Sequence, residues 1–258
     1  MVGMTTVAGH ILSSMALRTL VPAPARHALR AVASNMRWLP TRVLRSCARA
    51  TDRLPPGTGE VALTFDDGPH PEWTPQVLDL LAASGVRATF FVVGYRARQY
   101  PELVRTIRRE GHILGSHSGT HPDARRLGLR QLQRDYAEGR AALEAAIGEP
   151  VALFRPPNGT LDVKGVAVIR RLGLVPRLWT IDPQDWHPDT TTADIVARCA
   201  AANVGDVVLL HDGLERPLAP RALDRSATVS ALPQVIAAFR ERGLSFGTLV
   251  PLPASHPS

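Results

Sequence analysis

Short apolar segments alternate with amphipathic helical segments about seven times over residues 60–249 of the chain. Near-continuous apolar runs of about four to eight residues are typical of strands buried on both faces. Strands that alternate with helices in this way form parallel sheets. The pattern therefore predicts an α/β fold. Seven to eight such units favour a closed barrel, and an open sheet is the alternative.

The predicted strands cover residues 60–65, 88–93, 112–116, 151–154, 174–181, 207–210 and 245–249. The predicted helices cover residues 74–84, 101–110, 130–147, 163–172, 191–202 and 226–242. The helix over 130–147 is the clearest, and Gly148 is expected to end it.

The chain divides into three predicted regions: an Arg-rich extension over 1–57, partly helical or disordered, a catalytic domain over 58–250 and a short tail over 251–258. A Pro- and Gly-rich linker at 54–59 separates the first two. Residues 1–50 hold seven arginines and no Asp or Glu, whereas the other 208 residues hold 23 basic and 23 acidic side chains. Such a leader suggests a membrane-surface contact through residues 1–53, a targeting segment or an ordinary basic extension. The balanced body argues against nucleic acid as a partner.

The first 25 residues resemble a secretory signal only poorly. Their apolar stretch over 4–25 is interrupted by His10 and Arg18, and the first arginine follows most of the apolar run instead of preceding it. We therefore expect a cytoplasmic or membrane-associated protein, and a secreted one less. The sequence does not indicate an oligomeric state.

Polar residues stand directly after five of the predicted strands. They are Asp66-Asp67, His117, Arg155, Asp182 to Asp185, and His211-Asp212. In α/β barrels the active site is built at the C-terminal ends of the strands. The five strand ends are therefore predicted to form one site.

Two of these segments hold residues that bind metals. Asp66 and Asp67 leave a strand into a Gly-Pro turn, and His117 and His121 are four residues apart. Two histidines and one carboxylate can bind a divalent cation and leave positions open for water and substrate. Taken singly, Asp-Asp-Gly is also typical of a solvated turn, and with nine histidines in the chain the His spacing can arise by chance.

Three further segments supply an arginine, an acid and a histidine. Arg155 lies beside two prolines, Asp185 lies beside Trp186, and His211 ends a strand. A stiffly held arginine can orient a carboxylate, and a histidine at a strand end suits general acid catalysis. Each also has an ordinary structural explanation when it is taken alone.

Together, the five segments resemble the motifs of the polysaccharide deacetylase family, the NodB-homology domain of carbohydrate esterases. They occur in order as TFDDGP at 64–69, HSGTH at 117–121, RPPNG at 155–159, DPQDW at 182–186 and LLH at 209–211. The match covers residues 58–250, and the nearest resemblance is to chitooligosaccharide deacetylases. It implies a distorted (β/α) barrel, similar to a TIM barrel.

The resemblance implies a metal held by Asp67, His117 and His121. Zinc is the first candidate, and cobalt or nickel are alternatives because the same donors suit all three. Asp66 is implied to be the general base, and His211 the acid that protonates the leaving amine.

The other motif positions are implied to support these groups. Arg155 is expected to orient Asp66, and Asp185 to hold Arg155. The residue after the Arg-Pro-Pro run, here Asn158, is expected to donate its backbone N–H to the oxyanion. The substrate-binding set is expected to comprise Pro157, Asn158, Trp186 and Leu209.

One position departs from the family pattern. Asn158 stands where the family usually has Tyr, and the chain is poor in aromatic residues, at 5%. Long glycans stack on aromatic side chains, so a short oligosaccharide or small glycoconjugate is as credible a substrate as a polymer.

The sequence thus predicts a metal-dependent hydrolase that removes acetyl groups from N-acetylglucosamine-containing oligo- or polysaccharides, such as chitooligosaccharide or peptidoglycan. Two alternatives are an O-acetyl esterase acting on acetylated xylan or a similar glycan, and a non-catalytic sugar-binding protein.

Overall fold

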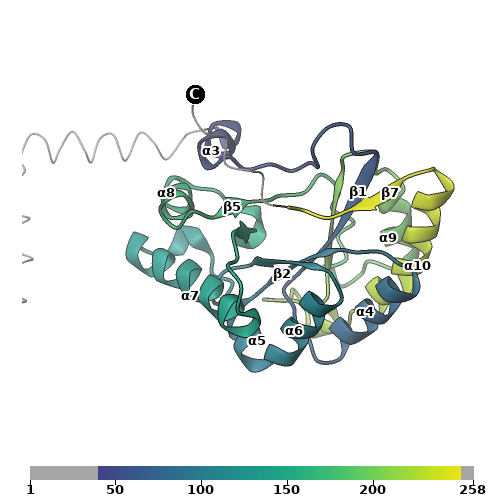
Figure 1. The fold of residues 1–258 in the computed structure, drawn as a ribbon, viewed down its shortest axis with the longest axis horizontal. Coiled ribbons are helices and arrows are strands. Elements are labelled where there is room, and N and C mark those ends of the chain that lie inside the picture. The colour runs from purple at the N-terminus through teal and green to yellow at the C-terminus, as the bar shows by residue number, and fades with distance from the viewer. Residues whose placement is uncertain (1–39, 251–258) are drawn as a thin grey trace, which may run out of the picture. The chain divides into compact units, whose positions relative to one another are not determined.

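The computed structural model describes residues 40–250. Seven strands lie in this part of the chain: β1 (Glu60–Asp66), β2 (Thr89–Val92), β3 (Ile113–Ser116), β4 (Leu153–Phe154), β5 (Val175–Pro176), β6 (Val207–His211) and β7 (Ser245–Gly247). The α-helices are α3 (Thr41–Ala48), α4 (Trp73–Ala83), α5 (Gly94–Gln99), α6 (Pro101–Arg109), α7 (Leu129–Ile147), α8 (Val163–Arg171), α9 (Thr192–Cys199) and α10 (Ser226–Glu241) (Figure 1). Short 3-10 helices are η2 (Ala124–Arg126), η3 (Pro157–Gly159) and η4 (Pro220–Leu223). The predicted membrane contact up to residue 39 and the tail from residue 251 lie outside the described residues.

All strand pairs are parallel, in the order β5-β4-β3-β2-β1-β6, and β7 pairs with the start of β1. The register places the carboxyl ends of the strands side by side. Asp66 is opposite His211 on one side and Phe91 on the other, and Ser116 is opposite Phe154. The residues that follow these strands therefore meet at one end of the sheet.

The gap between β5 and β6 is filled by segments that are not strands. Ile181 forms a parallel bridge with Val208, while Thr51 and Arg53 form bridges with Arg177 and Asp206. These bridges curl the sheet around, and the prediction of a distorted (β/α) barrel is confirmed.

The body of the fold begins before the boundary expected between residues 57 and 58. Leu44, Ala48 and Leu54 are buried, and the Leu54 N–H donates to the carbonyl of Gly205. Residues 51–54 are thus part of the barrel wall, although they fall within the predicted extension over 1–57.

Alternate residues of β1 pack on opposite faces. Val61, Leu63 and Phe65 belong to the large apolar cluster that β1 shares with the helices around the sheet, including α4 and α10. Ala62 belongs instead to the small cluster inside the barrel, and Thr64 and Asp66 face the same way. This period of two brings a carboxylate to the inner mouth of the barrel.

The strand expected over 174–181 is the main local difference. Only Val175–Pro176 pair as a strand, because the next two carbonyls are used elsewhere. The Arg155 side chain donates Nε–H to the Arg177 carbonyl and an Nη2–H to the Leu178 carbonyl. The Arg155 side chain therefore binds two carbonyls that would otherwise pair with a neighbouring strand. Helix α5 was not expected, because its six polar-rich residues are too few to show a periodicity.

The other expected elements are present to within a few residues. Helix α7 ends at Gly148, whose φ of 71° is left-handed, as expected for a glycine that ends a helix. Within residues 40–250, no helix combines the length and apolarity required for a membrane span.

Helix α7 lies unusually close to the loop that carries the two histidines of the second motif. A Cβ atom on Gly139 would overlap the carbonyl group of Ser118, and one on Gly94 would lie 2.7 Å from the Gly139 Cα. Both glycines are therefore needed for a close backbone approach.

Gly139→Ala tests this approach. Helix propensity alone favours alanine by about 1 kcal/mol, whereas overpacking typically costs about 1–3 kcal/mol. We expect the overlap to dominate, with a net loss of about 1–2 kcal/mol in the free energy of unfolding, measured by denaturant titration. Glu138→Ala, at the exposed neighbouring position, is the control. A stabilised Gly139→Ala variant would show that the loop moves without cost.

Candidate active site

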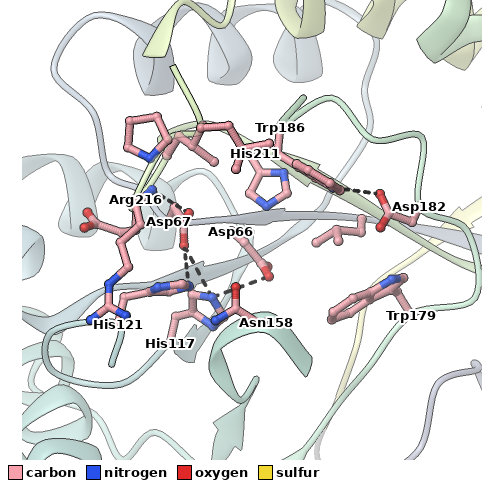
Figure 2. A pocket seen from close by; sticks show the side chains of 15 residues that line it. Asp66, Asp67, His117, His121, Asn158, Trp179, Asp182, Trp186, His211 and Arg216 are labelled. Carbon is pink, nitrogen blue, oxygen red and sulfur yellow. Dashed lines mark hydrogen bonds and ion pairs between the residues drawn. The ribbon is translucent and has the colours of Figure 1, made fainter. Parts of the chain in front are cut away.

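The motif residues converge on one pocket at the carboxyl ends of the strands. Figure 2 shows the two aspartates of the first motif, both histidines of the second, Asn158, Trp186 and His211 around it. Their side chains come from five segments of the chain, and the register of β1 and β6 places Asp66 beside His211. The structure therefore brings residues from all five motifs to one pocket at the strand ends.

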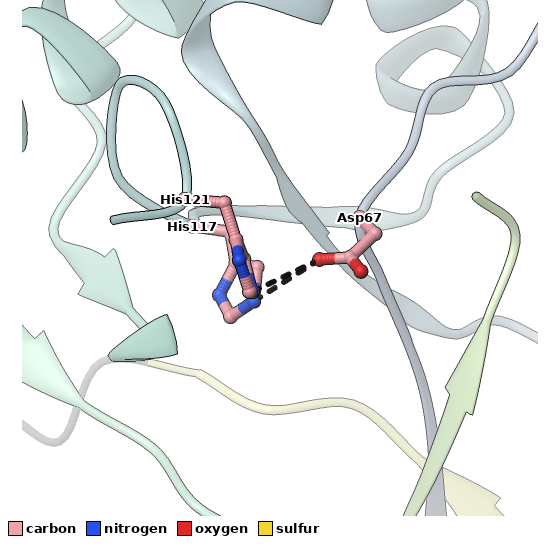
Figure 3. Close-up of side chains that lie close together, drawn as sticks. All are labelled: Asp67, His117 and His121. Atoms are coloured by element: carbon pink, nitrogen blue, oxygen red, sulfur yellow. Dashed lines mark ion pairs between the residues drawn. The ribbon is translucent and has the colours of Figure 1, made fainter. Parts of the chain in front are cut away.

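Asp67, His117 and His121 form a buried group of three potential metal ligands. The Asp67 Oδ1 lies 3.4 Å from His117 Nε2 and 3.5 Å from His121 Nε2 (Figure 3). One ligand atom from each residue lies within 4.8 Å of the other two. Asp67 Oδ1 is buried, yet it has no hydrogen-bond donor among residues 40–250. A buried carboxylate oxygen without a donor, facing two imidazole nitrogens, fits a divalent cation.

Hydrogen bonds to the backbone orient the two histidines. The His117 Nδ1–H donates to the Arg155 carbonyl at 2.8 Å, which leaves the Nε2 lone pair directed at Asp67. The Ser118 hydroxyl accepts the His121 N–H at 2.9 Å. Asp135 of α7 accepts the Gly119 N–H, so the helix holds the histidine loop in place.

Asp67 is held at its second oxygen. Oδ2 accepts the backbone N–H of Glu215 at 2.8 Å, from the loop after β6. Burial alone would raise the pKa of Asp67, but His117 and His121 outweigh it and the pKa is lowered. The carboxylate is therefore ionised, as a metal ligand must be.

Asp66 is paired with a fully buried arginine. The Arg155 Nη1–H donates to Asp66 Oδ1 at 2.7 Å and to the Thr64 hydroxyl at 2.8 Å. The other oxygen of Asp66 is 3.7 Å from His117 Nε2 and faces the metal-ligand group. The expectation that Arg155 orients Asp66 agrees with this geometry.

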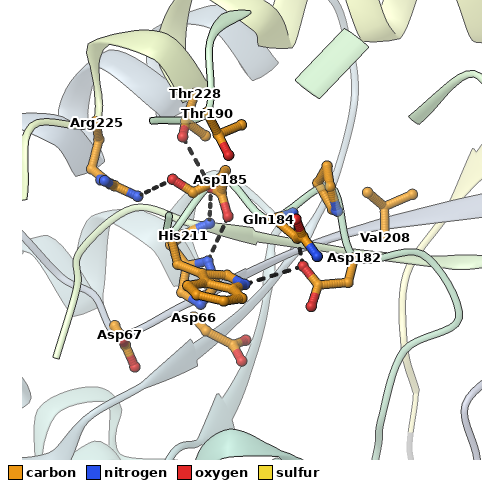
Figure 4. A network of polar contacts seen from close by, with 12 residues as sticks. Asp66, Asp67, Asp182, Gln184, Asp185, Thr190, Val208, His211, Arg225 and Thr228 are labelled. Atoms are coloured by element: carbon orange, nitrogen blue, oxygen red, sulfur yellow. Dashed lines mark hydrogen bonds and ion pairs between the residues drawn. The ribbon is translucent and has the colours of Figure 1, made fainter. Parts of the chain in front are cut away.

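Asp185 holds His211 and not Arg155, so the expected contact between Asp185 and Arg155 is wrong. The His211 Nδ1–H donates to Asp185 Oδ1 at 2.7 Å, and the His211 N–H donates to Oδ2 at 2.8 Å (Figure 4). The Thr228 hydroxyl also donates to Oδ2, and Arg225 donates to the Asp185 carbonyl. The Arg155 guanidinium already donates to Asp66, Thr64 and two backbone carbonyls, so it needs no second carboxylate.

The pKa of His211 follows from this pairing. Burial alone would lower it, but the Asp185 carboxylate, with Asp67 and Asp66, raises it to about 9. His211 therefore carries a proton at Nε2 at neutral pH, while Nδ1–H remains bound to Asp185.

The predicted substrate-binding residues differ in their positions. Asn158, Trp186 and Leu209 line the pocket, and Asn158 has a left-handed φ of 55°. The Trp186 Nε1–H donates to Asp182 Oδ1 at 3.2 Å, which fixes the indole at the rim. Pro157 is buried and does not line the pocket, so it shapes the backbone that presents Asn158.

Residues 53–176 match the sequence profile of the family described as Polysaccharide deacetylase. A chitooligosaccharide deacetylase from Sinorhizobium fredii is 37% identical over 204 residues, which cover 78% of this chain and 95% of the relative. The chain belongs to the polysaccharide deacetylase family. The resemblance inferred from the five motifs is confirmed.

Other members of the polysaccharide deacetylase family are similarly close. A peptidoglycan-N-acetylglucosamine deacetylase from Bacillus cereus is 37% identical over 191 residues, covering 73% of this chain and 85% of the relative. The structure of a family 4 carbohydrate esterase from Streptomyces lividans, in complex with acetate, gives a TM-score of 0.65 at 34% identity and covers 74% of this chain and 92% of that one. A crystal structure of a peptidoglycan N-acetylglucosamine deacetylase gives a TM-score of 0.73 at 29% identity, covering 82% and 95%.

Several residues of this deacetylase-family site were given no individual role from the sequence. Trp179 and the loop over 214–218 line the pocket, and so does Asp182, which was expected at the site only as part of its motif. Asp212 accepts the Thr74 hydroxyl at 2.5 Å and packs so tightly on Gly68 that a Cβ there would overlap its carboxylate. The position of Asp212 directly after His211 was the only available signal, because the other contacts join segments far apart in the chain.

Asp185→Asn tests the carboxylate beside His211. A general acid must be protonated, so turnover falls as the pH rises through its pKa. Without the carboxylate, burial is left to lower that pKa, and the falling limb of kcat/KM should move to lower pH by about one unit or more. Asp182→Asn, which removes a pocket carboxylate that does not contact His211, should leave the limb in place. An unmoved limb in Asp185→Asn, with unchanged metal content, would contradict His211 as the titrating group.

Proposed function

We propose that this protein is a metal-dependent hydrolase that removes N-acetyl groups from N-acetylglucosamine-containing oligo- or polysaccharides and releases acetate. The observation that carries the proposal is the arrangement of Asp67 with the two histidines. Asp67 Oδ1 faces both imidazole Nε2 atoms and accepts no hydrogen bond within residues 40–250. A second carboxylate, Asp66, lies beside them and is bound by Arg155. The named activities of the relatives support the same reaction.

Asp67, His117 and His121 would hold the metal, and we propose zinc. Two imidazoles and a carboxylate are ordinary zinc donors, and cobalt and nickel accept the same set. The bound cation would supply Lewis-acid activation of a water and of the acetamide carbonyl.

Asp66 is proposed to take the proton of the attacking water. Its Oδ2 faces the metal ligands while Oδ1 is bound to Arg155, so one oxygen is aimed at the reaction and the other is held. The hydrogen bond from Arg155 fixes the direction of the Asp66 carboxylate. A carboxylate with one oxygen held and the other free suits a general base.

His211 is proposed to protonate the leaving amine. It stands across the pocket from the metal ligands, and its raised pKa keeps Nε2 protonated at neutral pH. An amine leaves poorly unless it is protonated, so an amide substrate requires this proton. The backbone N–H of Asn158 is the proposed donor to the oxyanion.

We propose short N-acetylglucosamine oligomers and peptidoglycan fragments as substrates. Trp179 and Trp186 provide the aromatic surface of the rim, and Asn158 stands where the family usually has an aromatic residue. A reduced stacking surface favours a short segment of glycan over a long one.

The central test is mass spectrometry of products from a panel of N-acetylglucosamine oligomers. The zinc-loaded wild-type protein should release acetate and shift each oligomer by one acetyl group per event, whereas a chelator should abolish turnover and added zinc should restore it. Asp66→Asn should bind one zinc but release no acetate. Acetate release that survives complete removal of metal would contradict the proposal.

His211→Ala tests N- against O-deacetylation. An ester has a better leaving group than an amide and depends less on the acid. The variant should therefore lose about tenfold more activity on an N-acetyl than on an O-acetyl sugar, which corresponds to ~1.4 kcal/mol. Equal losses on matched substrates would argue against His211 as the acid. Wild-type activity confined to O-acetyl sugars would favour the esterase alternative.

A further inference from the structure

One wall of the pocket is formed by the loop after β6, and it carries a single strong cation. Leu214, Glu215, Arg216, Pro217 and Leu218 line the pocket there. Within the described range 40–250, Arg216 is the one Lys or Arg among the lining residues. Figure 2 places it on the His121 side of the pocket, across from Trp179 and Asp182.

The loop is fixed on the side that precedes Arg216. The Glu215 N–H donates to the metal-ligand candidate Asp67, and Glu215 Oε1 accepts the Tyr95 hydroxyl at 2.5 Å and the Arg96 Nε–H at 2.7 Å. Gly213 lies so close to the Asp67 carbonyl that a Cβ atom there would be 2.6 Å from its oxygen. Arg216 is therefore presented from a held backbone, which lowers the entropy lost when its side chain binds a ligand.

The backbone of Arg216 is left-handed, with φ of 52°. Described non-glycine residues that share a positive φ are Arg49, Asp67, Ser118, His121, Asn158, Gln184 and Arg216. All but Arg49 lie in the site or beside one of its residues. Non-glycine residues with a left-handed backbone cluster at functional sites, where the surrounding structure holds them in that conformation. Arg216 belongs to that group by position and by conformation.

The acidic side chains of the pocket form no ion pair with Arg216 within residues 40–250. Asp66 is bound by Arg155, and Glu215 is bound by Arg96. Asp182 accepts the Gln184 N–H and the Trp186 Nε1–H. Within residues 40–250, Arg216 has no ion pair and no side-chain hydrogen bond. An exposed guanidinium at the rim of a pocket is left with a fork of donors for an incoming anion.

We propose that Arg216 is a specificity-determining residue that binds an anionic group, a carboxylate or a phosphate, on the glycan next to the N-acetyl group to be cleaved. This rests on the proposed function, because it adds a charged substituent to the same N-acetylated substrate. A planar guanidinium binds both anions through paired N–H donors. The neutral stacking surface lies on the opposite side of the pocket, at Trp179 and Trp186.

The experiment compares matched pairs of substrates that differ only in charge. One pair is an oligomer of N-acetylglucosamine and N-acetylmuramic acid with free carboxylates, against the same oligomer with its carboxylates converted to amides. The other is an N-acetylglucosamine oligomer with a terminal phosphate, against the oligomer without it. The readout for zinc-loaded protein is the ratio of kcat/KM on the charged substrate to that on its neutral match.

The wild-type ratio should exceed one for at least one pair, and Arg216→Gln should reduce it about tenfold, as expected for the loss of a charge-assisted hydrogen bond. The pair that responds identifies carboxylate or phosphate as the anion. Arg216→Lys should keep part of the preference. Arg130→Gln, at an exposed position near the start of α7 and outside the pocket, should leave the ratio unchanged.

The outcomes separate this inference from the function on which it rests. A wild-type protein that deacetylates the neutral oligomers, with the same ratios in Arg216→Gln as in wild type, overturns the anion site alone. A wild-type protein that releases acetate from none of the four substrates overturns the proposed function itself.

Discussion

The buried guanidinium of Arg155 is the interaction on which both the barrel and the site depend. It fills the interior of the barrel, 4.1 Å from the centre of the Phe91 ring, and replaces strand pairing for two carbonyls after β5. It also binds Asp66 at 2.7 Å. Leaving one partner of a buried ion pair without the other costs about 3–5 kcal/mol. The charge that holds the barrel together is therefore the charge that aims the proposed base.

The rest of the site is assembled by close backbone approaches. Helix α7 comes near the histidine loop because Gly139 has no side chain, and Asp212 packs on Gly68 for the same reason. Each approach lets one segment hold another at a metal ligand or at its neighbour. The donors are thus preorganised by the scaffold, so little ordering remains to be done when a cation and a substrate bind.

Much of this was predictable from the sequence, because strand and helix periods and strand-end polar residues are local signals. The donors Asp67, His117 and His121 and the pair of Asp66 with Arg155 are where the motifs imply. The partner of Asp185 was not predictable. Asp185 binds His211 and not Arg155 because the guanidinium of Arg155 already donates to the carbonyls of the Arg177 segment, and those contacts cannot be read from the sequence. The loop at Arg216 was missed for a similar reason. Its contact with Asp67 uses the backbone N–H of Glu215, and every residue except proline has such a group, so the sequence does not indicate the contact.

The bridges of Thr51 and Arg53 to the barrel wall have a consequence for how such chains can diversify. A segment that closes a seam is tied to the catalytic body, whatever its composition. Helix α3 precedes the seam and buries Leu44 and Ala48, so it belongs to the same body. The point at which a new leader or a fusion partner can be joined to this scaffold therefore lies before α3, and not at the Pro-Gly stretch that looks like a natural junction.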